Sequence, residues 1–261
     1  MTKLMGVVNV TPDSFSDGGL YLDPEAAIEH GRELVAAGAA ILDVGGESTR
    51  PGADPVDAEE ELRRVVPVVQ GLGGSDCGIS VDTSKAAVAE AALDAGATIV
   101  NDVTALRGDP AMASLCAECG ATVVLMHMLG DPRTMQSDPC YDDVVAEVKD
   151  FLAERLAAAV AAGIAEERIW LDPGIGFGKT PAHNMELLRR LGELTELGRP
   201  LVIGTSRKSF IGKVDGSAAG ERLGGTIASS VLAAAEGAEV LRVHDVAEVR
   251  QALAVAAAIL G

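Results

Sequence analysis

The sequence predicts one α/β domain in which eight parallel strands, each followed by a helix, close into a (β/α)8 TIM barrel. Eight short runs of mostly β-branched and aliphatic residues recur along the chain, with helical patterns between them and no linker-like stretch. This alternation is typical of a parallel sheet covered by helices. The length of 261 residues is close to the roughly 250 of one such barrel, so the domain is expected to span residues 1–261. An open doubly wound sheet shows the same alternation and stays the structural alternative.

The predicted strands are nearly continuous apolar runs, as expected for parallel strands that are buried on both faces. They are expected at residues 4–9, 41–44, 79–82, 98–101, 122–126, 169–171, 201–203 and 240–243. Aromatic residues make up only 3% of the chain, so aliphatic side chains and alanine must fill the core.

Local capping signals mark the helix boundaries. Asp23 before Pro24 predicts an N-cap and a first-turn proline for a helix that ends near Gly38. Asp57, in a pattern like a capping box, predicts the start of the next helix, and Pro67 is expected to kink or end it. Further helices are expected at 142–162, from residue 181, at 225–235 and at 246–260.

Charge and composition exclude several classes of protein. The formal net charge of −18 disfavours binding to nucleic acid or to anionic membrane surfaces, and an anionic substrate would need a locally positive or metal-assisted site. No apolar run approaches the ~20 residues that cross a bilayer, and no leader-like pattern is seen, so a cytoplasmic protein is expected. Cys116 and Cys119 form a C-x-x-C without a second pair, so neither a disulfide framework nor a zinc site is expected.

Polar side chains follow every predicted strand at its carboxyl end. Because these ends meet at one rim of a barrel, where such folds build active sites, the side chains are expected to converge. A single Asp at such a place is more often a turn former, but all eight strands ending this way favours a site. The residues are Asn9, Glu47 with Ser48, Asp82, Asn101 with Asp102, His127, Asp172, Arg207 with Lys208, and Arg242 with His244.

Two loops near the start of the chain are rich in groups that can bind or cover an anion. The loop at 11–19 is long and polar, with Phe15 as its one aromatic residue. The loop at 45–52 combines glycines, hydroxyls and the Arg50 guanidinium. The segment at 174–180 is close to a nucleotide-binding P-loop, but Pro173 stands where that pattern needs Gly. A pocket wall presenting Phe177 is expected there instead.

Five segments together resemble the dihydropteroate synthases, a family of pterin-binding enzymes. The first two, at 5–19 and 45–52, read MGVVNVTPDSFSDGG and GGESTRPG. The others, at 172–179, 206–210 and 242–245, read DPGIGFGK, SRKSF and RVHD, and all five stand in the family's order. The similarity covers the chain from residue 4 to about residue 255.

The resemblance implies a transferase of folate biosynthesis. Such an enzyme joins the methylene carbon of 7,8-dihydropterin-6-ylmethyl diphosphate to the amine of p-aminobenzoate, giving 7,8-dihydropteroate and pyrophosphate. An ionisation-first route through a stabilised pterin cation needs no protein nucleophile. It needs a neutralised leaving group and a preorganised site from which water is excluded.

By the same resemblance, residues on several strands are expected to hold the pterin. Asp172 would accept from the pterin amino group and a ring N–H, and Lys208 would donate to the pterin carbonyl and a ring nitrogen. Arg242 would stack on the ring and, with His244 and Asn9, hold the pyrophosphate. The pterin pocket would be completed by Asp82, Asn101 and Met126. The expected catalytic residues are Asp82, Asp172, Lys208, Arg242 and His244.

The resemblance also implies a second pocket, a metal and a partner. Mg²⁺ is expected on the diphosphate, in contact with Asn9 and Asp13. A homodimer is expected through helices on the C-terminal side, one of them at 227–235. Sulfonamides imitate p-aminobenzoate and are expected to inhibit. The p-aminobenzoate pocket is expected at Phe15, Thr49, Arg50, Pro51, Phe177, Lys208 and Ser209.

Three other functions share parts of this pattern. A methyltetrahydrofolate:corrinoid methyltransferase shares the barrel and the pterin contacts, but it has no use for loops suited to pyrophosphate. A lysine-dependent aldolase would form a Schiff base at Lys208, although the neighbouring Arg207 and an anionic ligand favour a protonated amine. A non-catalytic pterin-binding paralogue would keep the ligand residues without turnover.

Overall fold

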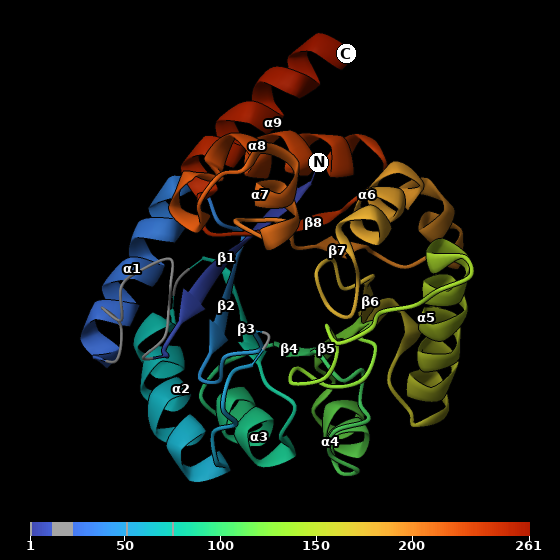
Figure 1. Cartoon of the computed structure of the whole chain (residues 1–261). Coiled ribbons are helices and arrows are strands. Elements are labelled where there is room, and N and C mark those ends of the chain that lie inside the picture. The colour runs from blue at the N-terminus through green and yellow to red at the C-terminus, as the bar shows by residue number, and fades with distance from the viewer. Residues whose placement is uncertain (1, 12–22, 51, 75) are drawn as a thin grey trace.

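Eight parallel strands form one sheet that curls round until its two edges meet (Figure 1). The computed structural model describes residues 2–11, 23–50, 52–74 and 76–261. The strands of this part of the chain are β1 (Lys3–Asn9), β2 (Ile41–Gly45), β3 (Gly78–Asp82), β4 (Ile99–Asp102), β5 (Thr122–Met126), β6 (Ile169–Asp172), β7 (Val202–Ile203) and β8 (Val240–Val243). Their order in the sheet is β6-β5-β4-β3-β2-β1-β8-β7.

The ring closes between β6 and β7. Leu171 of β6 forms a parallel bridge with Leu201, just before β7, and the Leu171 N–H donates to the Pro200 carbonyl at 2.9 Å. The predicted (β/α)8 barrel is therefore confirmed, and the open doubly wound sheet is excluded.

Helices connect the strands and lie outside the barrel, packed on a continuous aliphatic core (Figure 1). Among the described residues, no helix combines the length and apolar character that crossing a bilayer requires. The helices are α1 (Pro24–Ala37), α2 (Ala58–Leu72), α3 (Ala86–Asp94), α4 (Met112–Cys119), α5 (Val144–Ala161), α6 (Pro181–Arg189), α7 (Ser209–Asp215), α8 (Leu223–Ala235) and α9 (Val246–Leu260). Short 3₁₀ turns are η1 (Glu166–Arg168), η2 (Leu191–Leu197) and η3 (Ala219–Glu221).

The local capping signals are confirmed. The Asp23 carboxylate accepts from the Glu25 amide at 3.1 Å, and the Asp57 carboxylate accepts from the Glu60 amide at 2.8 Å. Each bond satisfies a backbone donor that the first turn of a helix leaves unpaired. Helices α5, α6, α8 and α9 begin within two residues of their predicted positions.

Of the two outcomes predicted for Pro67, a kink or an end of the helix, the second is wrong, because α2 continues to Leu72. A proline inside a helix costs about 3 kcal/mol through its missing N–H and its ring. Val65, Val68 and Val69 are fully buried around this position. Burying each such side chain contributes roughly 1.5–3 kcal/mol, which offsets the local cost and keeps the helix on the barrel.

Inside the barrel, a polar layer lies on an apolar one. Because strand side chains alternate, a residue two positions beyond an inward-facing one points to the same interior. The apolar layer is a buried cluster of Met5, Ile41, Ile99, Val124, Val202 and Val240, with Trp170 packed against it. Two positions beyond its members on β2, β4, β5, β6 and β8 stand Asp43, Asn101, Met126, Asp172 and Arg242. These five side chains therefore stand on an apolar floor, near the carboxyl ends of the strands.

The loop after β6 lies close to the loop after β5, so alanine substitution should destabilise the protein more at Gly174 than at Gly198. Gly174 and Gly198 both have a φ of 67°, but a Cβ on Gly174 would lie 1.9 Å from the His127 carbonyl oxygen, whereas one on Gly198 would meet nothing within 4 Å. Gly198→Ala should lower the free energy of unfolding by about 1–2 kcal/mol through backbone strain alone. Gly174→Ala should lower it by about 1–3 kcal/mol more. Urea unfolding measures both, and equal losses would contradict this packing.

Candidate active site

A buried cluster of charges around Arg242 connects four strands. From β8, Arg242 donates through Nε to Asp43 Oδ2 at 2.6 Å and through Nη2 to Asp82 Oδ2 at 2.8 Å. Asn101 on β4 donates through Nδ2 to the same Asp43 oxygen at 3.1 Å. Although burial opposes it, the charges of Asp43 and Asp82 raise the pKa of Arg242. The guanidinium is therefore permanently charged, and it holds β2, β3 and β8 in a fixed relation.

Asp43 is a member of this cluster that the sequence analysis missed. It is fully buried in the middle of β2, between Leu42 and Val44. A carboxylate at such a position needs a cation, because an unpaired buried charge is very costly. An acidic residue inside an otherwise apolar predicted strand was the signal that could have found it.

A second pair, Asp172 and Lys208, stands on the adjoining part of the rim. Asp172 ends β6, and its Oδ1 accepts from the Gly174 amide at 2.7 Å, which fixes the orientation of the carboxylate. The Lys208 ammonium donates to the Ile175 carbonyl and lies 4.8 Å from the centroid of the Phe177 ring. The cation–π contact places the charge over a flat apolar surface.

Burial shifts the pKa values of Asp82, Asp172 and Lys208 towards neutral pH, and the charge of a partner opposes each shift. Burial raises the pKa of Asp82 to about 7, although Arg242 opposes the rise. Burial also raises the pKa of Asp172, against the charge of Lys208. It lowers the pKa of Lys208 to about 8, against the charge of Asp172. Such clustering of shifted pKa values is typical of functional sites.

His244 follows β8 on the same rim and is neutral. Burial lowers its pKa to about 3, helped by the charges of Arg207, Arg242 and Arg50. Its Nδ1 lies 3.0 Å from the Ser206 hydroxyl, which fixes the plane of the ring.

The remaining residues predicted for the site fall into three groups. Met126 pairs in register with Asp172, and Asn9 with Gly45, so both lie at strand ends on the rim. Thr49 and Arg50 are half-buried in the loop after β2, whereas Ser209 is exposed at the start of α7. Asp13, Phe15 and Pro51 lie outside the described residues.

Two strand-end residues stabilise loops instead of joining the central cluster. Glu47 pairs with Lys85 and accepts from the Val56 amide at 3.2 Å. The Asp102 carboxylate accepts from the Thr104 amide at 2.8 Å and from the Leu106 amide at 2.9 Å. Both carboxylates therefore bond to groups of their own loops or of Lys85, outside the cluster around Arg242.

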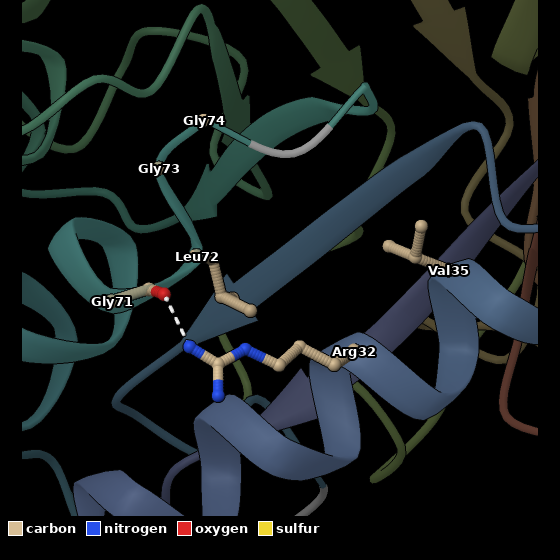
Figure 2. Close-up of a pocket in the computed structure, with 6 residues that line it drawn as sticks. All are labelled: Arg32, Val35, Gly71, Leu72, Gly73 and Gly74. Carbon is tan, nitrogen blue, oxygen red and sulfur yellow. Dashed lines mark hydrogen bonds between the residues drawn. The ribbon is translucent and has the colours of Figure 1, made fainter.

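A separate pocket of about 290 Å³ lies between α1 and the end of α2 (Figure 2). Arg32 crosses it and donates through Nη2 to the Gly71 carbonyl at 3.4 Å. Helices that follow barrel strands end at the opposite face from the rim, so this pocket is remote from the cluster around Arg242.

A closed parallel barrel with paired charges at the carboxyl ends of its strands defines a (β/α)8-barrel enzyme. Residues 5–244 match the family described as pterin binding enzyme. Dihydropteroate synthase of Escherichia coli strain K12 is 49% identical over 258 residues, which is 98% of this chain and 91% of the relative. The chain belongs to the pterin-binding enzymes and, among them, to the dihydropteroate synthase family.

Two solved structures agree with this assignment. A Yersinia pestis dihydropteroate synthase in complex with a sulfonamide drug has a TM-score of 0.96 and 45% identity, covering 99% of this chain and 94% of its own. A Xanthomonas albilineans dihydropteroate synthase with 4-aminobenzoic acid has a TM-score of 0.93 and 50% identity, covering 100% and 93%. The family resemblance drawn from the sequence is confirmed, and the synthase is favoured over the methyltransferase and the non-catalytic paralogue.

The raised pKa of Asp82 predicts a pH dependence of stability. Between pH 4 and 7 the folded protein keeps a proton on Asp82 that the unfolded chain releases, so raising the pH weakens the folded state. In the wild type, Asp82 should lower the free energy of unfolding by up to about 1.4 kcal/mol for each pH unit of this rise. In Asp82→Asn this contribution should be absent. Urea unfolding from pH 4.5 to 6.5 measures it, with Asp150→Asn on the exposed surface of α5 as the matched control. Parallel pH profiles for the wild type and Asp82→Asn would contradict the shift.

Proposed function

We propose that the rim around Arg242, Asp172 and Lys208 is where this dihydropteroate synthase carries out its transfer. The C–O bond between the methylene carbon of 7,8-dihydropterin-6-ylmethyl diphosphate and its leaving group breaks. The amine of p-aminobenzoate then forms a C–N bond to that carbon and loses a proton. The products are 7,8-dihydropteroate and pyrophosphate. The observation that carries the proposal is the meeting of two cations and two titratable carboxylates on one apolar floor.

The pterin would bind against Asp172 and Lys208. The Gly174 amide orients the Asp172 carboxylate, so its oxygens can accept a planar pair of N–H groups from the ring. Lys208 would donate to the pterin carbonyl and a ring nitrogen. Asp82 and Asn101 would complete the pocket, and Met126 would pack against the ring as an apolar wall. A carboxylate near the ring favours the positive charge that develops when pyrophosphate leaves.

The leaving group would be held by Arg242, His244 and Asn9. Arg242 is already fixed by two carboxylates, so its position costs little reorganisation during the reaction. His244 is neutral, and an imidazole N–H can donate to a phosphate oxygen without a proton transfer. The guanidinium plane would also stack on the pterin.

Mg²⁺ would assist at the diphosphate through Asn9 and Asp13. Among the described residues there is no group of three or more His, Cys, Asp or Glu that could hold a metal ion. The Asn9 amide oxygen is a hard donor at the carboxyl end of β1. Such a sparse donor set suits an ion bound mostly by substrate oxygens, as Mg²⁺ often is. When bound, the ion would neutralise charge on the departing pyrophosphate.

The p-aminobenzoate would bind beside the pterin, under the loops after β1, β2 and β6. Phe177 would supply the apolar wall and Arg50 a charge for the carboxylate, and the other residues of this pocket would be Phe15, Thr49, Pro51, Lys208 and Ser209. Support comes from the Xanthomonas albilineans relative, which was solved with 4-aminobenzoic acid.

The same proposal describes the chain as a single-domain cytoplasmic enzyme that forms a homodimer. Helices α8 and α9 pack side by side near the C-terminus (Figure 1). They expose large apolar side chains, among them Leu232 at 63%, Val255 at 55% and Ile259 at 77%. Apolar surface of this kind is typical of a face that another subunit covers.

Release of pyrophosphate tests the function. With both substrates and Mg²⁺ present, pyrophosphate should appear in a coupled assay, and it should fall sharply when p-aminobenzoate is omitted or Mg²⁺ is chelated. Asp172→Asn should lower kcat/KM for the pterin substrate about 10- to 100-fold, because it replaces a charged acceptor by an amide that also donates. Asp150→Asn is the surface control. Pterin binding without any pyrophosphate release would instead support a non-catalytic protein.

Inhibition by sulfonamides tests the second pocket. A sulfonamide should raise the apparent KM for p-aminobenzoate without changing the maximal rate, as competition for one pocket requires. The Yersinia pestis relative in complex with a sulfonamide drug supports this expectation. Steady-state inhibition kinetics measure it, and absence of inhibition at millimolar drug would reject the pocket as drawn.

A further inference from the structure

The segment between β6 and α6, residues 173–180, has an unusual set of backbone contacts. It carries Phe177, the proposed wall of the p-aminobenzoate pocket. In loops, carbonyl groups that are not bonded within the protein bond to water. Here four consecutive carbonyl oxygens each accept from a side chain. The donors are Lys208 to Ile175, Gln136 to Gly176 at 2.7 Å, Lys179 to Phe177 at 3.0 Å and Tyr141 to Gly178 at 2.7 Å.

Two of these donors flank Phe177 from the loop between β5 and α5. Gln136 holds the residue immediately before Phe177, and Tyr141 holds the residue immediately after it. The Phe177 ring packs against a methionine-rich cluster that includes Met128 and Met135 from the same loop. The loop after β5 therefore contacts both the backbone and the ring of this wall.

The opposite side of the segment is fixed by α6. The Gly176 backbone N–H donates to the Asn184 side-chain oxygen Oδ1 at 2.7 Å, and Asn184 Nδ2 donates to the Thr180 carbonyl at 2.9 Å. Asn184 is buried in α6. With donors on one side and an acceptor on the other, the backbone around Phe177 has few alternative conformations.

Close packing adds to these bonds. A Cβ on Gly178, where φ is 64°, would lie 2.6 Å from Leu129 Cβ. The two loops therefore touch backbone to backbone, with no room for a side chain between them. A movement of one loop must displace the other.

The Tyr141 hydroxyl donates one hydrogen bond, to the Gly178 carbonyl, and its surroundings fix the direction of that bond. Burial raises the pKa of its hydroxyl to about 12, so the group remains a donor at neutral pH. Its ring meets the His183 ring edge-on at 5.0 Å between centroids and lies 6.1 Å from the His127 ring. The ring cannot turn freely between these neighbours, so the hydroxyl stays aimed at Gly178.

A contact between Lys179, which belongs to this segment, and His127 after β5 also stabilises it. Lys179 Nζ lies 2.8 Å from His127 Nδ1 as well as donating to the Phe177 carbonyl, and both side chains are buried. Burial lowers the pKa of His127 to about 3, so the ring is neutral and its nitrogen can accept. His127 thus contacts a lysine of the loop after β6, which gives this strand-end residue a structural partner.

We propose that Tyr141 and Gln136 are positioning residues for p-aminobenzoate, acting through Phe177. By fixing Gly176 and Gly178 they set the tilt of the ring and its distance from the Lys208 ammonium, which lies 4.8 Å from the ring centroid. This inference rests on the proposed place of Phe177 in the p-aminobenzoate pocket. Among the described residues, the hydrogen bonds of Gln136 and Tyr141 reach Gly176 and Gly178 and neither Asp172 nor Arg242, so their main effect should fall on p-aminobenzoate.

The experiment compares Tyr141→Phe, Gln136→Ala and Phe177→Ala in steady-state kinetics, with Gln70→Ala on exposed α2 surface as the matched control. Tyr141→Phe keeps the ring and deletes only the donor. It should raise the apparent KM for p-aminobenzoate about 3- to 10-fold, as loss of one hydrogen bond allows, and leave the KM for the pterin diphosphate within about 2-fold. Gln136→Ala should act in the same direction but more weakly, because Gln136 is exposed.

The double variant separates a positioning role from a merely structural one. If Tyr141 acts through Phe177, Tyr141→Phe should have no further effect on that KM in the Phe177→Ala background. Three results would overturn the inference. Tyr141→Phe could raise the KM for p-aminobenzoate equally in both backgrounds, it could raise the KM values for both substrates, or it could raise neither. Phe177→Ala alone tests the proposed pocket: an unchanged KM for p-aminobenzoate would reject that pocket while pyrophosphate release still reported the enzyme's activity.

Discussion

The half-buried guanidinium of Arg242, paired with two buried carboxylates, is the constraint on which the rest of the site depends. A charge inside a barrel is tolerated only if opposite charges and hydrogen bonds replace the water that it has lost. Asp43 and Asp82 supply both, and Asn101 donates to one of the same carboxylates. Removing Arg242 would leave Asp43 as an uncompensated charge in the interior, and removing Asn101 would take away a hydrogen-bond donor of the same carboxylate. The strands that carry these side chains are therefore held in one register by ion pairs and side-chain hydrogen bonds as well as by backbone pairing.

This arrangement also shifts the acid–base properties of the rim. An apolar layer seals the barrel below the charges, so their fields act in a region of low dielectric. Burial shifts the pKa values of Asp82, Asp172 and Lys208 towards neutrality, and each is opposed by a neighbouring charge. A site of this kind can stabilise a cation and a departing anion at once without supplying a nucleophile.

The loops after β5 and β6 add a second level of order. Their backbones touch at Gly174 and Gly178, and side chains from one loop bond the carbonyls of the other. The proposed wall at Phe177 lies on irregular structure and needs such support, because a loop without it would place an aromatic ring only loosely. The barrel fixes the charged groups directly, whereas the neighbouring loop fixes Phe177.

Local signals in the sequence determined much of this protein. Apolar runs located the eight strands, Asp23 and Asp57 marked helix starts, and polar residues at strand ends located the rim, because each effect acts within a few residues of the chain. Pro67 does not end α2, because burial of its neighbours outweighs its local cost. Asp43 was missed, and Glu47 and Asp102 were grouped with the site, because the partners of these side chains are set by the fold. Arg242 and Asp43 are 199 positions apart, so only the closed barrel could bring a cation from the last strand to a carboxylate on the second.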